Sequence, residues 1–284
     1  MEKLQRLSPL QIAPWALLAA LFGPTFKMLY TNHWEKLDYT HAYFILPISL
    51  YLVWKKRQTL TETPIKHTKT STLTGLSLTV LAIFIYLLGR QNDYTSVQVF
   101  SILPFITGIT IYLYGTKILK TLWFPITYIA LLVPPPAAIL DSVTLPMRKI
   151  ITVLTDKILL LANYPIERQG LLLTINGHEI YMGAPCSGFR SLITLIALGT
   201  VYIYTTKTTN KNKLILTALI LPLALLGNLI RVLSVCIVTN YTGHNRFQQI
   251  YHDASGLVMF VIVIIGLMAL ENILTKTQAK KGGE

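Results

Sequence analysis

The sequence predicts an all-α polytopic membrane protein with a small extracytoplasmic β-hairpin. Of its 284 residues, 52% are hydrophobic and 13% are charged, whereas soluble domains carry about 25% charged residues. The apolar residues also form long runs. The run 214–239 contains one charge, Arg231, and the run 254–270 contains none. Runs of about 18 or more apolar residues are long enough to cross the hydrocarbon core of a bilayer.

These runs predict about eight transmembrane helices in one integral membrane domain over residues 1–284. The first run lacks a clear cleavage site, so we interpret it as a signal anchor and first span. In chain order the expected spans cover about 12–30, 41–54, 73–89, 97–115, 122–139, 187–204, 214–239 and 254–270.

The placement of basic residues predicts the orientation of these spans. Lys and Arg cluster in the connections 55–69, 117–120 and 207–213, whereas the alternate short connections hold only Lys36, Arg90 and Arg246. Basic connections face the cytoplasm. Both termini of an inner-membrane protein are therefore expected to be cytoplasmic. The net charge of +13 does not indicate nucleic-acid binding, because no basic face is interleaved with aromatic residues.

The long connection at about 141–185 is expected outside the cytoplasm and has two parts. Its first part predicts an amphipathic helix in the interface plane. In its second part, Asn176-Gly177 separates the apolar runs 171–175 and 178–182, which predicts a β-hairpin leading into Cys186. The apolar positions of the helix are Met147, Ile150, Ile151, Leu154, Ile158 and Leu161.

Arg231 is the first candidate for a functional residue. It lies inside the seventh expected span, and ionisable residues in spans are costly and mostly functional. Asn228, one turn earlier, would be a supporting polar group. The structural alternative is an arginine that packs between helices or binds a lipid phosphate.

Cys186 is expected at the outer N-terminus of the sixth span. The helix dipole lowers the pKa of a thiol there, and Arg190, four residues later on the same face, would lower it further. A thiolate of this kind is a nucleophile. The structural alternative is a small apolar residue at a helix cap. Cys236 is expected to serve packing only, and no disulfide or cysteine-based zinc site is indicated.

His252 is expected at the outer start of the eighth span, next to Asp253 as a supporting group. A histidine near its ordinary pKa can accept and return a proton; the structural alternative is an interfacial histidine. Cys186, Arg231 and His252 are all expected in the outer half of the membrane, and cysteine with histidine suits acyl transfer through a thioester. No H-E-x-x-H motif indicates a metal, and no cofactor is predicted.

At these residues the chain resembles the exosortase/archaeosortase family of membrane transpeptidases. The resemblance lies in P-C-S-G-F-R-S at 185–191, N-L-I-R-V at 228–232, H-D-A-S-G at 252–256 and an N-terminal signature at 34–57. Thr40 and Ala42 depart from the usual S-H-G of that signature. The resemblance implies a Cys186–Arg231–His252 active site.

The resemblance also implies the partners. Substrates would be exported proteins ending in a short motif (Pro-Glu-Pro in many bacteria), a transmembrane helix and a basic tail. The new C-terminus would pass to a lipid or envelope acceptor. Two alternatives stay open: hydrolysis alone, with water as acceptor, and a transporter or lipid-binding protein in which Arg231 is a counter-charge. The two related halves with broken helices that would favour a transporter are not evident in the sequence.

Overall fold

A computed structural model describes residues 9–31, 41–65, 68–183, 189–206, 208–243 and 246–281. The chain is mostly helical and divides into two compact units, Met1–Pro136 and Ala137–Glu284. The single domain expected from the sequence stays a prediction.

The first unit consists of helices whose positions follow the first five expected spans. The helices are α1 (Pro9–Leu29), α2 (Ala42–Lys55), α3 (Arg57–Glu62), α4 (Lys69–Gln91), α5 (Thr95–Phe100), α6 (Ile102–Tyr128) and the 3₁₀ helix η2 (Ile129–Leu132).

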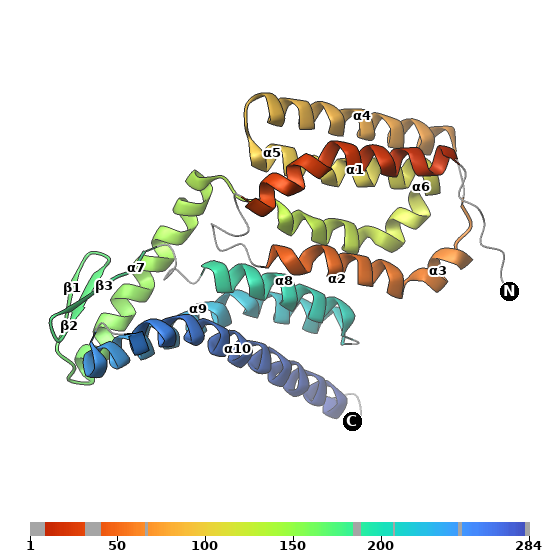
Figure 1. Cartoon of the computed structure of the whole chain (residues 1–284). Coiled ribbons are helices and arrows are strands. Elements are labelled where there is room, and N and C mark those ends of the chain that lie inside the picture. The colour runs from red at the N-terminus through yellow and green to blue at the C-terminus, as the bar shows by residue number, and fades with distance from the viewer. Residues whose placement is uncertain are drawn as a thin grey trace. The chain divides into compact units, whose positions relative to one another are not determined.

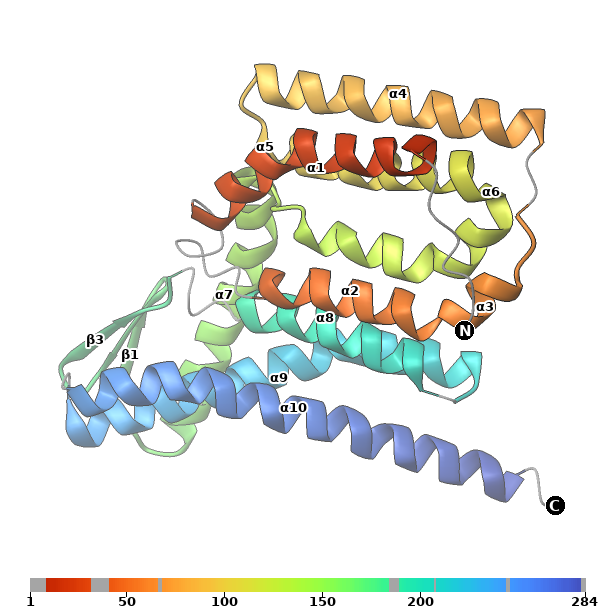
Figure 2. The ribbon, with the colours of Figure 1, turned by 45° about the vertical axis from the view of Figure 1, so that its right-hand side comes forward.

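Gly115 divides α6 into two arms, 102–114 and 116–128. Its φ of 81° and ψ of 173° lie outside the helical region, in a conformation that glycine adopts without steric cost. The arms fold back on each other (Figures 1 and 2), which explains why the sequence shows two runs here. The expected end of the fifth span at residue 139 is wrong. A proline run, 134–136, follows η2, and α7 begins at Ala137.

Helices α4 and α6 meet through glycines. A Cβ atom added at Gly75 would lie 2.6 Å from the backbone nitrogen of Tyr112, and one at Gly108 would lie 2.4 Å from Thr79 Oγ1. Small residues of this kind allow transmembrane helices to approach closely. The opposite face of α4 exposes large apolar side chains, as expected of a helix that contacts lipid: Leu73, Leu76, Val80, Phe84 and Leu87.

In its described residues the second unit contains four long helices and a three-stranded sheet. Its elements are α7 (Ala137–Leu161), β1 (Ile166–Gln169), β2 (Leu172–Ile175), β3 (His178–Tyr181), α8 (Phe189–Thr205), α9 (Asn210–Thr242) and α10 (Arg246–Lys281). The predicted outer helix is α7, and the sheet packs beside it and against one end of α9 (Figure 2).

The sheet contains the predicted hairpin and one strand more. The strands are antiparallel in the order β1-β2-β3. Asn176 and Gly177 have φ values of 50° and 78° and form the two-residue turn between Ile175 and His178, which confirms the hairpin. Strand β1 was not predicted, because three of its four side chains are exposed and it lacks an alternating apolar pattern.

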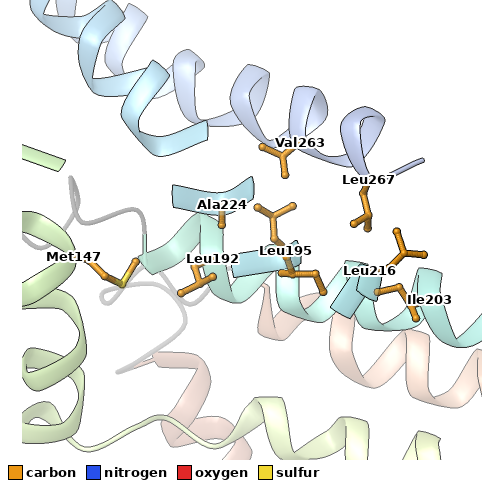
Figure 3. Packing of buried hydrophobic residues seen from close by; sticks show 9 residues of the cluster. Met147, Leu192, Leu195, Ile203, Leu216, Ala224, Val263 and Leu267 are labelled. Carbon is orange, nitrogen blue, oxygen red and sulfur yellow. The ribbon is translucent and has the colours of Figure 1, made fainter. Parts of the chain in front are cut away.

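Two apolar clusters hold the second unit together. One joins α8, α9 and α10, with Met147 of α7 beside Leu192 of α8 (Figure 3). The other joins α7 and the sheet to α9 and includes Ile151, Val232 and Cys236. Cys236 is fully buried, so its predicted packing role is confirmed.

The membrane character of the chain rests on its long apolar helices. Among the described residues, three stretches are long and apolar enough to cross a bilayer: Lys69–Gln91, Thr95–Leu132 and Asn210–Thr242. The second contains the Gly115 turn and therefore both arms of α6. Ala13–Leu29, Ala42–Lys55 and Leu192–Thr205 are shorter apolar helices. The count of eight spans and their orientation stay predictions.

Candidate functional site

Arg231 lies within α9 and contacts α10. Its side chain is partly buried, and its Nε–H donates to the Oγ of Ser255 at 3.3 Å. Ser255 is 8% exposed. A guanidinium group in an apolar helix is stable only when its donors find acceptors. This hydrogen bond holds the guanidinium group of Arg231 next to Ser255 on α10.

His252 and Asp253 lie in the same helix, close to Ser255. Both belong to α10, and the structure describes their backbone but not their side chains. Residues three apart in a helix share a face, so position 252 lies one turn from the serine that binds Arg231. The α9–α10 pair therefore brings two of the three predicted catalytic positions to neighbouring places.

Asn228 precedes Arg231 by one turn of α9. It is 1% exposed, and the same helical periodicity places it on the Arg231 face. A buried amide in an apolar span is costly unless it forms hydrogen bonds. Its supporting role in the site stays a prediction.

Cys186 lies outside the described residues. Arg190 belongs to the first turn of α8, and its side chain is not described. The chain on either side of this segment is anchored. Met182 is fully buried in the cluster that contains Val232, and its N–H donates to the carbonyl of Leu171 at 2.9 Å. Phe189 packs against the α8–α9–α10 cluster.

Ser255 is the residue of this site that sequence reasoning missed. It is part of the H-D-A-S-G stretch, but a serine in an apolar run gives no signal of its partner. The spacing of three from His252 could have indicated a shared face.

Among the residues described, no group of three or more His, Cys, Asp or Glu side chains could hold a metal ion. The absence of a metal and of a cofactor stays a prediction.

No curated protein and no solved structure matches the chain. The family model for the transmembrane exosortase matches residues 33–269. This match spans most of the chain and includes positions 186, 231 and 252. The chain therefore belongs to the transmembrane exosortase family.

Proposed function

We propose that this protein is a membrane-embedded cysteine transpeptidase that cleaves the C-terminal sorting signals of exported proteins. Its family acts on such proteins. The reaction would proceed at the extracytoplasmic face through a thioester on Cys186. The observation that carries the proposal is the hydrogen bond from Arg231 to Ser255, because Ser255 is one helical turn from position 252 on α10.

Chain connectivity supports a place for Cys186 near this pair. Two residues lie between it and Gly183, and two lie between it and Phe189. Both flanking residues belong to the unit that carries α9 and α10, and α8 packs directly against α9.

The position of Arg231 along α9 supports an extracytoplasmic site. Lys211 and Lys213 lie in the first turn of this helix. At 1.5 Å per residue, Arg231 lies about 30 Å farther along the axis than Lys211. That separation is about the thickness of the hydrocarbon core. If the basic α8–α9 connection faces the cytoplasm, Arg231 approaches the opposite face.

The proposed chemistry assigns one task to each residue. The Cys186 thiolate attacks the scissile carbonyl carbon, and Arg231 stabilises the resulting oxyanion. When the C–N bond breaks, His252 gives a proton to the leaving amine and a thioester remains. His252 then accepts the proton of the acceptor nucleophile, which attacks the thioester and regenerates the thiolate. Arg190, Asn228 and Asp253 would support these groups.

The test compares the two cysteines of the chain. Cys186→Ala should abolish processing of a sorting-signal substrate and the acyl-enzyme adduct seen by mass spectrometry. Cys236→Ala is the matched control, because Cys236 packs between α9 and the sheet and should leave processing intact. Processing at the wild-type rate in Cys186→Ala would refute the proposal.

The mass of the processed C-terminus separates the two possible acceptors. Transfer adds the mass of the acceptor, whereas hydrolysis leaves a free carboxylate.

A further inference from the structure

Helix α7 buries several polar side chains and exposes several apolar ones. Ile150, Leu154, Ile158 and Leu161 are 39–85% exposed. A different face carries four buried polar residues, which we call the α7 polar stripe: Thr144, Arg148, Thr152 and Thr155. Their spacing of four, four and three residues follows one face of a helix. The apolar face suits lipid, so the stripe faces the protein interior.

The guanidinium of Arg148 lacks an adequate counter-charge among the described residues. Its Nη2 donates to Thr144 Oγ1 at 2.9 Å. Its one described ion-pair partner is Asp141, whose Oδ1 lies 3.4 Å from Nη2. That carboxylate is weak compensation, because the Asp141 side chain is 73% exposed while that of Arg148 is 11% exposed.

Two buried polar atoms of the stripe have no hydrogen-bond partner in the part of the chain that the structure describes. They are Arg148 Nε and Thr155 Oγ1, and they lie two helical turns apart on one face. Nε and Nη2 form the same edge of the guanidinium, the edge that binds both oxygens of a carboxylate. Nη2 already donates to Thr144 and contacts Asp141, so the Nε–H is the donor of this edge that is left for an incoming anion, because a buried donor without an acceptor is costly.

The stripe lies beside the proposed active site. Met147 packs in the cluster that contains Leu192 of α8 (Figure 3). Ile151 packs in the cluster that contains Val232, the neighbour of Arg231. Arg148 lies between these two anchors on α7. Arg148 therefore lies on the segment of α7 that packs against α8 and α9, the helices of the proposed site.

We propose that Arg148 binds a carboxylate of the polypeptide substrate, the acidic side chain of its sorting motif. The inference rests on the proposed function, because it takes the substrate to be a sorting-signal peptide. The burial of Arg148 on the polar face favours a peptide carboxylate over a lipid phosphate, which would approach from the exposed apolar face. Arg231 is then left for the oxyanion, with Arg148 as the specificity residue.

The test measures binding to the full-length chain in lipid nanodiscs, in a Cys186→Ala background that prevents turnover. The probes are two synthetic peptides with a transmembrane helix and a basic tail, one carrying Pro-Glu-Pro and one Pro-Gln-Pro. Charge-assisted bonds are worth about 10- to 100-fold in affinity, so the glutamate probe should bind more tightly by about that factor.

Variants of α7 assign this preference to one side chain. Arg148→Gln should reduce the ratio of the two affinities to about one, and Arg148→Lys should leave an intermediate ratio because lysine lacks the planar fork. Lys149→Gln is the matched control, since Lys149 is the exposed neighbouring base, and should keep the full ratio.

Three results would overturn the proposal. The first is equal affinity for both probes, or no binding of the glutamate probe, when Arg148 is present; this result does not depend on whether a variant folds. The second is a preference for glutamate that survives Arg148→Gln. The third is an effect of Arg148→Gln only on the response to phosphatidylglycerol content, which would assign the residue to lipid phosphate. Cleavage that persists in Cys186→Ala would instead refute the proposed function alone.

Discussion

Replacing Gly75 by alanine should separate α4 from α6. The new Cβ atom would lie 2.6 Å from Tyr112 N, 2.9 Å from Gly108 O and 2.9 Å from Tyr112 Cα. All three neighbours are backbone atoms, so no side chain can rotate away. Restoring the closest contact to 3.4 Å requires the helices to move apart by about 0.8 Å, which forfeits a quarter to a half of the local dispersion energy.

The net cost follows from two opposing effects. Overpacking costs about 1–3 kcal/mol, and the rigid backbone contacts place Gly75→Ala near the upper value. The gain in helix propensity returns about 1 kcal/mol. We therefore expect a loss of about 2 kcal/mol in the free energy of unfolding.

Intrinsic fluorescence can follow this change. All four tryptophans, at positions 15, 34, 54 and 123, lie in the first unit, so a denaturant titration in micelles reports on the unit that contains Gly75. The control is Gly23→Ala, where the added Cβ atom has no neighbour within 4 Å. That variant should be neutral or slightly stabilised. Equal stabilities of the two variants would refute the packing argument.

Three further predictions concern the second unit. Ser255→Ala removes the hydroxyl that accepts from Arg231 Nε. The substitution should lower kcat for processing by about 10-fold or more with little change in KM, because hydrogen bonds to charged groups contribute about 1.5–3 kcal/mol. An unchanged kcat would contradict this role of Ser255. Glu271→Gln weakens the hydrogen bond from Tyr202 and should lower the free energy of unfolding, measured by thermal unfolding, by about 1 kcal/mol. In a Tyr202→Phe background the same substitution should lower this free energy by less. Gly177→Ala forces alanine into a φ of 78° and should cost about 1–2 kcal/mol, seen as faster hydrogen exchange in β2 and β3; unchanged exchange would count against a strained turn.

The helices were predictable because hydrophobicity alone determines where they form. The runs that predict α4 and α9 lie within the observed helices. The turn at Gly115 was indicated only by a gap between two runs. The inward face of α7 was not predictable, since a pattern of apolar and polar residues does not reveal which side meets lipid. Strand β1 has no pattern of its own, and pairing with β2 determines its structure.

The site was predictable in part for a similar reason. Arg231 stands out because a charge in an apolar run is rare. Its bond to Ser255 depends on how α9 packs against α10, which a single sequence does not encode locally. Arg148 gave no signal either. On an amphipathic helix an arginine is ordinarily a solvated residue, and only its burial distinguishes it.

The turn at Gly115 has a consequence for how the protein is made. A single residue outside the helical region joins the two arms of α6. The connection between the arms in the nascent chain is therefore too short for them to move far apart. One arm therefore cannot insert into the bilayer while the other remains in water. We expect the pair to leave the insertion machinery together as a preformed helical hairpin, with Lys117 and Lys120 held on the side where synthesis takes place.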